Sequence, residues 1–281
     1  MLGTNTSYRS PADAGFVDYL SFLSGIHSFF RQNNAPLQPV VVKGIAGAQS
    51  NGVDVAGDGN ALVSYEDFFK NAYDLASKYH TNVGSKRQTG EDLFEQLVEK
   101  ELVWKTTIYV VTSQGEKKPL EVNLRTYLGD STSSKVGQFY YAYNRALVEG
   151  DIVFYAGHNR SMCDYDPSFL SQMAGSRLPQ KKYRIVVANG CSTTRNFEKY
   201  VPPGLLATTD IVANGLTSKA LNNEPLHFFT SLFSTDPLPW KTFLERMADG
   251  ASSDPLRNVI LAKGSTVDRT KPPAYTLSFQ P

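Results

Sequence analysis

Two stretches of sequence decide the fold: DIVFYAGHNR, residues 151–160, and YRIVVANGCST, residues 183–193. Each begins with a near-continuous apolar run, which is typical of a strand buried on both faces of a sheet. Each run is followed closely by a glycine and a reactive side chain, His158 in the first stretch and Cys191 in the second. A similar run, DIVANG at residues 210–215, indicates a third strand. We therefore predict an α/β fold with a mostly parallel sheet.

The sequence on either side of these runs divides the chain into two predicted parts. Residues 104–281 form the α/β domain, in which strands 106–112 and 120–127 make an antiparallel hairpin. Residues 1–103 are predicted as a mainly helical N-terminal segment. The other predicted elements are helices 12–31, 91–102, 136–148, 167–173, 226–233 and 240–247, a helix that Ser64 opens, strands 40–42, 259–262 and 275–279, and a loop over 44–60.

Composition excludes several classes of protein. The chain has 281 residues and balances 28 basic against 27 acidic residues, so nothing favours nucleic acid as a partner. No apolar stretch reaches the roughly 18 to 20 residues of a membrane helix, and the N-terminus does not resemble a signal peptide. We expect a soluble protein, either cytoplasmic or exported with its signal already removed. Two cysteines and four histidines at these spacings indicate neither a disulfide framework nor a structural zinc site.

The chemistry of the two strand ends points to acyl transfer. Ligands of open α/β sheets bind at the carboxyl ends of the strands, where both His158 and Cys191 are expected. A thiolate attacks a carbonyl carbon, and a nearby imidazole protonates the leaving amine. Gly190 allows a sharp turn before the thiol, and backbone N–H groups of Cys191 and of a residue near His158 would form an oxyanion hole.

This pattern of an apolar strand ending in His, followed by one ending in Cys, resembles clan CD cysteine peptidases, the caspase, gingipain, legumain and CHAT group. The resemblance covers roughly residues 104–262 and implies a caspase–haemoglobinase-like fold and a protein or peptide substrate. It makes Cys191 the nucleophile and His158 the general acid and base, with the oxyanion site at the backbone of Asn159, Gly190 and Cys191. No cofactor is required for such chemistry. Asn159 stands where that family usually has glycine, and this departure leaves a second reading open, a catalytically inactive binding or scaffold module.

Four further polar residues are expected to line a substrate pocket. Asp164 and Asp166 follow His158 in one loop, and Asp210 and Asn214 belong to the third strand. Acidic groups in such a pocket would favour a basic side chain at the cleaved residue of the substrate. Cys163, in the same loop as the first pair, is interpreted as an ordinary surface or packed thiol.

The N-terminal part contains one segment with the pattern of a calcium loop. Its candidate ligands are Asp54, Asp58, Asn60 and Asp67, with Gly59 at the bend and a helix at the end. The alternative is a polar loop followed by a helix that Ser64 and Asp67 cap. A Ca²⁺ ion bound here would be structural or regulatory, in keeping with an exported protein.

Overall fold

A computed structural model describes most of the predicted elements. The described residues are 2–4, 14–60, 62–72, 97–112, 114–130, 136–157, 183–190, 208–214, 223–234, 236, 238–249, 260–263, 267–268, 270–271 and 278–280. The helices are α1 (Ala14–Gln32), α2 (Tyr65–Lys70), α5 (Val136–Glu149), α8 (Glu224–Leu232) and α9 (Trp240–Asp249). The strands are β1 (Leu2–Thr4), β2 (Gln38–Val41), β3 (Ala48–Gln49), β4 (Gly52–Asp54), β5 (Leu62–Val63), β6 (Glu101–Val111), β7 (Lys117–Asp130), β8 (Ile152–Ala156), β9 (Arg184–Asn189), β10 (Thr209–Asn214), β11 (Ile260–Lys263) and β12 (Ser278–Gln280).

Five neighbouring strands of the main sheet run parallel, in the spatial order β7-β1-β8-β9-β10. The strands at the two ends of the sheet, β11 on one side and β6 followed by β12 on the other, are antiparallel to their neighbours. The apolar runs at 152–156 and 184–189 thus pair side by side and in parallel, as the sequence predicts. The broad prediction of an α/β fold with a mostly parallel central sheet is confirmed.

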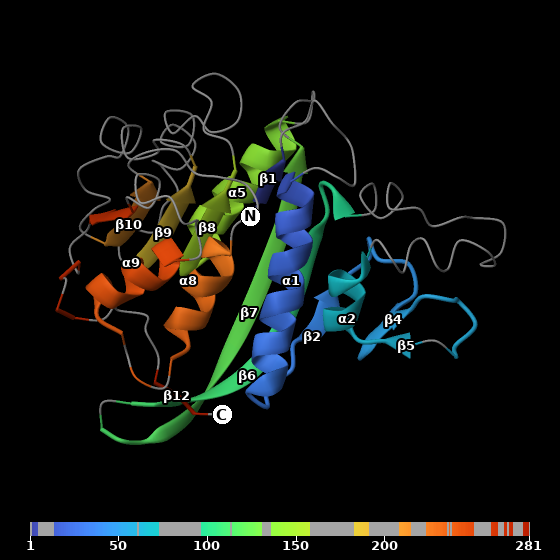
Figure 1. The fold of residues 1–281 in the computed structure, drawn as a ribbon, viewed down its shortest axis with the longest axis horizontal. Coiled ribbons are helices and arrows are strands. Elements are labelled where there is room, and N and C mark those ends of the chain that lie inside the picture. Colours follow the sequence, from blue (N-terminus) through green and yellow to red (C-terminus); the bar gives the residue numbers. More distant parts are fainter. Residues whose placement is uncertain are drawn as a thin grey trace.

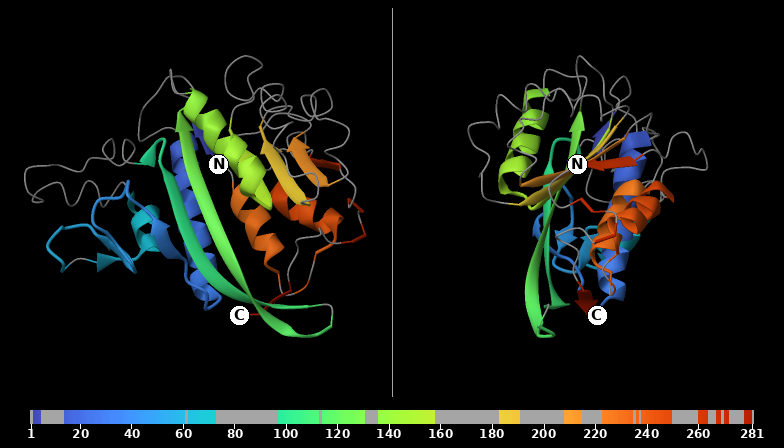
Figure 2. Two further views of the ribbon diagram at one scale, coloured as in Figure 1. Left: turned by 180° about the vertical axis from the view of Figure 1, so that it is seen from behind. Right: turned by 90° about the vertical axis from the view of Figure 1, so that its left-hand side faces the viewer.

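The parallel strands do not follow one another in chain order. Along the chain they come as β1, β7, β8, β9 and β10, so in space the second strand lies outside the first and the remaining three lie on its other side. The connection from β7 to β8 therefore passes over β1 and carries α5. Figure 2 shows α5 on one face of the sheet and α1, α8 and α9 on the other. Helices on opposite faces are what right-handed crossovers require when the winding direction reverses.

The alternation of side chains along the strands builds one core on each face. On the side of α1, α8 and α9, the large core contains Phe154 and Val187. Phe154 contacts Phe228 of α8, with ring centroids 5.2 Å apart. On the α5 side, Tyr155 and Val186 pack with Tyr143 of α5. Each large apolar side chain that is fully buried stabilises the folded state by roughly 1.5–3 kcal/mol. Because both faces of these strands are covered, apolar residues are favoured at every position and the strands show no alternation with polar residues.

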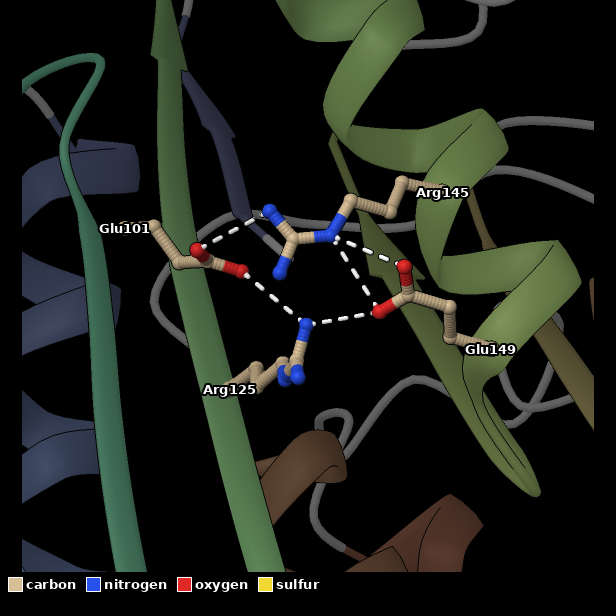
Figure 3. Close-up of polar contacts among 4 residues, drawn as sticks. All are labelled: Glu101, Arg125, Arg145 and Glu149. Carbon is tan, nitrogen blue, oxygen red and sulfur yellow. Dashed lines mark hydrogen bonds and ion pairs between the residues drawn. The ribbon is translucent and has the colours of Figure 1, made fainter. Parts of the chain in front are cut away.

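The predicted hairpin is also confirmed, and it is longer than expected. β6 and β7 pair from Glu101↔Tyr127 to Val111↔Lys117 and form the tall ribbon of Figure 1. Four charged side chains join it to α5, two from the hairpin, Glu101 and Arg125, and two from the helix, Arg145 and Glu149, as Figure 3 shows. Arg125 donates to Glu149 at 2.8 Å, and Arg145 lies 3.3 Å from Glu101 and 3.2 Å from Glu149. All four groups are at least one third exposed, and surface pairs of this kind contribute little to stability, about 0–1 kcal/mol each.

The N-terminal third differs from the mainly helical segment that its sequence predicts. Its described part contains helices α1 and α2, but also a short strand, β1, in the middle of the main sheet. It contains a small sheet ordered β3-β4-β5 as well, and β3 and β4 lie within residues 44–60, where we predict only a loop. The helix predicted over 91–102 is wrong at its end, because Glu101 and Leu102 belong to β6. Pairing with β7 outweighs the apolar periodicity that suggested a helix there.

The remaining helices and edge strands lie close to their predicted positions. α1, α5, α8 and α9 overlap the ranges predicted for them, and β2, β11 and β12 appear near the expected strands. β11 is an edge strand beside β10, and β12 pairs with the hairpin strand β6 instead of joining the parallel strands. The helix predicted over 167–173 lies outside the described residues.

Candidate functional site

The carboxyl ends of β8 and β9 meet in register, and this is where the sequence places the reactive pair. Ala156 pairs with Asn189, and the backbone N–H of Gly157 donates to the carbonyl oxygen of Asn189 at 3.0 Å. The described chain stops at Gly157 and Gly190, immediately before His158 and Cys191. His158, Asn159, Cys163, Asp164, Asp166 and Cys191 themselves lie outside the described residues.

The same edge of the sheet contains the point at which the strand order reverses. β1 is the first parallel strand along the chain, and its neighbours are the second, β7, and the third, β8. Leu2 pairs with both Leu128 and Ala156, so the end of β8 lies directly beside β1. In open α/β sheets the chain leaves such neighbouring strands in opposite directions, which opens a crevice for ligands at their carboxyl ends. His158 follows the strand on one side of this point.

A cluster of buried polar side chains lies at the carboxyl ends of β9 and β10. Asn189 and Asn214 are the last residues of their strands, and Asn214 Nδ2 donates to Asn189 Oδ1 at 2.6 Å. Asn189 also hydrogen-bonds the carboxyl group of Glu224, the first residue of α8. All three side chains are at most 2% exposed. A buried amide that accepts from one partner and donates to another holds both strand ends against the helix.

The environment of Glu224 changes its acidity. Burial raises the pKa of its carboxyl group to about 7, the hydrogen bond from Asn189 opposes this rise, and the nearby charge of Asp18 on α1 adds to it. Glu224 therefore changes its protonation state close to neutral pH, at the edge of the sheet where the chain leads into Cys191.

Asp210 and Asn214, both predicted to line one pocket, lie at opposite ends of β10. Asn214 ends the strand, whereas Asp210 is its second residue and pairs with Ile185 near the start of β9. Asp210 is fully buried and accepts a hydrogen bond from Tyr183 Oη. Asp210 therefore lies at the end of β10 opposite to the carboxyl edge that leads into His158 and Cys191, and only Asn214 of the two lies at that edge.

The four candidate calcium ligands are all described, and the loop uses them for its own hydrogen bonds. Asp54 accepts from the N–H groups of Gly57 and Gly59 at 2.9 and 2.8 Å. Asp58 accepts from the N–H of Asn60 at 2.9 Å. Within the described ranges, no three acidic, histidine or cysteine side chains gather as a metal ion would require.

Asp67 takes the role that the capped-helix alternative predicts. Ser64 accepts from the N–H of Asp67 at 3.1 Å and donates to the Asp67 carboxylate at 2.8 Å, at the start of α2. The helix cap therefore occupies the acid that would otherwise complete the calcium loop.

His27, on α1, belongs to a core of aromatic side chains. Its ring lies edge-on to Trp104 with centroids 4.5 Å apart and stacks on Tyr65 at 5.6 Å. Burial lowers its pKa to about 3, and its Nε2 atom has no hydrogen-bond partner within the described part of the chain. A neutral imidazole held among aromatic rings is a packing residue.

A hollow of about 300 Å³ lies away from the strand ends, at the junction of α1 with the hairpin. Its lining residues are Asn34, Ala35, Pro36, Gln38, Lys105, Thr106, Thr107 and Glu121. They include no cysteine or histidine, and the β6 and β7 positions among them belong to the middle of the hairpin. We therefore place the candidate site at the carboxyl edge of the parallel strands.

Two residues of this edge were not singled out by the sequence. Asn189 had a recognisable signal, since it is a polar residue that directly follows the apolar run at 185–188. Glu224 had none, because a glutamate in the first turn of a helix is commonly exposed and only the packing of α8 buries it.

Comparison of this chain with protein families, with curated proteins and with solved structures finds no match. In the described residues, no helix is long and apolar enough to cross a membrane.

Proposed function

We propose that this protein is a cysteine endopeptidase in which Cys191 is the nucleophile and His158 the general acid and base. The observation that carries the proposal is the in-register pairing of β8 and β9, with Gly157 bonded to the carbonyl of Asn189. This pairing brings the chain to the positions just before His158 and Cys191 on adjacent strands at one edge of the sheet. The substrate would be a protein or peptide.

The proposed reaction has two steps. The Cys191 thiolate attacks the carbonyl carbon of the peptide bond, and protonated His158 gives its proton to the leaving amine as the C–N bond breaks. A water molecule, deprotonated by His158, then attacks the thioester carbonyl, which releases the carboxylic acid product and the thiolate. Backbone N–H groups at Cys191, preceded by Gly190, and at Asn159 would stabilise the oxyanion in both steps. These steps need no metal ion or other cofactor.

We propose that the α/β fold of this protein has the caspase–haemoglobinase-like topology. Its support is the order of the parallel strands, in which the third strand precedes the histidine, the fourth precedes the cysteine, and the first lies on the other side of the third. The reversal of strand order beside β8 favours a substrate crevice there.

The test is the reactivity of the thiol together with cleavage of a peptide mixture. The full chain is treated with iodoacetamide across pH, and the adducts are located by mass spectrometry. We expect fast labelling of Cys191 and cleavage that both Cys191→Ala and His158→Ala abolish, while Cys163→Ala is the matched control and cleaves normally.

The catalytically inactive binding or scaffold module is the second candidate, and the asparagine at position 159 favours it. An asparagine restricts the backbone where the related peptidases use glycine, and this would weaken the oxyanion site. A Cys191 that labels no faster than Cys163, with no cleavage even after limited proteolysis, would support this candidate and refute the peptidase.

A further inference from the structure

Asn189 connects three elements at the edge of the sheet. Its carbonyl oxygen accepts from the N–H of Gly157 at the end of β8, its Oδ1 accepts from Asn214 at the end of β10, and its side chain hydrogen-bonds Glu224 at the start of α8. Two residues of chain span at most about 7 Å, so the hydrogen bonds of Asn189 anchor the backbone close to Cys191.

We propose that Glu224 is a positioning residue which, through Asn189, holds the strand end that leads into Cys191 and whose charge controls the reactivity of that thiol. This inference rests on the proposed function. Glu224 belongs to α8, which follows β10 in the chain, and not to either of the strands that precede His158 and Cys191.

Burial of Glu224 strengthens the electrostatic effect of a charge on its carboxyl group. Glu224, Asn189 and Asn214 are each at most 2% exposed, so water does not screen a carboxylate at Glu224 as it would on the surface. The groups that face it are Asn189 of β9, which donates to it, and Asp18 of α1, which repels its negative charge. Near neutral pH, ionisation of Glu224 places a negative charge by the strand end and opposes formation of the Cys191 thiolate.

The experiment measures the rate of Cys191 alkylation by iodoacetamide from about pH 5 to pH 9 in the full chain. Glu224→Gln keeps the size and the hydrogen-bonding oxygen but cannot ionise. We expect the wild-type profile to contain an ionisation near pH 7 from Glu224 in addition to those of the Cys191–His158 pair. In Glu224→Gln we expect this additional ionisation to be lost, the apparent pKa of the thiol to fall, and labelling to be faster by about three-fold or more at pH 8.

Two variants make the result specific. Glu66→Gln, a largely buried glutamate on α2 that pairs with Arg31, is the control and should leave the profile unchanged. Asn214→Ala removes the bond to Asn189 without touching the charge, and it should alter the rate at all pH values while keeping the ionisation near pH 7. If Glu224→Gln does not fold, Asp18→Asn still tests the proposal, because burial and the Asp18 charge both raise the pKa of Glu224, and removing that charge should move the Glu224 ionisation to lower pH. An unmoved profile in Asp18→Asn would contradict the proposal.

The outcomes separate this inference from the proposed function. A reactive Cys191 whose pH profile is the same in wild type and Glu224→Gln overturns the role of Glu224 and leaves the peptidase intact. A Cys191 that reacts no faster than Cys163 in every variant overturns both. Loss of the ionisation near pH 7 in Glu224→Gln alone supports the proposal.

Discussion

Among the described residues, two buried groups with shifted pKa values have opposite effects on stability between pH 4.5 and pH 7.5, and the first of them is His27. Its pKa is about 3 in the folded protein against 6.5 for an ordinary histidine, so the unfolded chain binds a proton that the folded chain does not. The stabilisation is therefore complete above pH 6.5 and is lost as the pH falls toward 3. At about 1.36 kcal/mol per pH unit, the titration of His27 lowers the free energy of unfolding by roughly 2.7 kcal/mol between about pH 7.5 and pH 4.5.

Glu224 acts in the other direction. Its pKa is about 7 in the folded protein against 4.5 for an ordinary glutamate, so the folded chain holds a proton that the unfolded chain releases. This stabilisation is complete below pH 4.5 and is lost as the pH rises through 7. From about pH 7.5 to pH 4.5 the titration of Glu224 raises the free energy of unfolding by roughly 3 kcal/mol, which offsets the loss at His27.

The assay is urea unfolding of wild type, Glu224→Gln and His27→Phe at several pH values between 4.5 and 7.5. Relative to wild type, Glu224→Gln should lose about 3 kcal/mol of unfolding free energy on acidification, because only the loss at His27 remains. His27→Phe should gain a similar amount, since phenylalanine fits among the aromatic rings and does not titrate. Differences from wild type cancel the titration of all other groups.

Parallel pH curves for wild type and Glu224→Gln would refute the assignment of Glu224 as a group buried in its protonated form. Parallel curves for wild type and His27→Phe would likewise refute the burial of a neutral imidazole beside Trp104.

Two further predictions concern the N-terminal part. Ser64→Ala should lower the unfolding free energy by about 1 kcal/mol, because the cap at the start of α2 is lost, and urea unfolding at neutral pH would show no change if the cap were not formed. Millimolar Ca²⁺ should leave the Tm unchanged, because Asp54 already closes its loop by accepting two N–H groups and Asp67 caps a helix; a rise in Tm that Asp54→Asn abolishes would contradict this.

Much of the fold could be predicted from local patterns. The apolar runs at 152–156 and 184–189 are typical of strands covered on both faces, and the sheet confirms them as neighbours. The hairpin and the helices α1, α5, α8 and α9 follow from periodicity, which depends only on the residues of each element. The cap formed by Ser64 is equally local and was predictable for the same reason.

Elements decided by distant partners were not predictable. β1 has only three residues, too few for any periodicity, yet it lies between β7 and β8 in the centre of the sheet. The start of β6 at Glu101 depends on pairing with Tyr127. Each of these features arises from partners that lie far away along the chain.

The sequence by itself determined which segments are buried strands and which reactive residues follow them, because burial on two faces demands continuous apolar runs. Only the tertiary structure decided that β1 separates the hairpin from β8, that the ends of β8 and β9 lie in register, and that Glu224 is buried against Asn189. The physical reason is that register and burial are set by packing between elements far apart in the chain, and no local pattern records that packing.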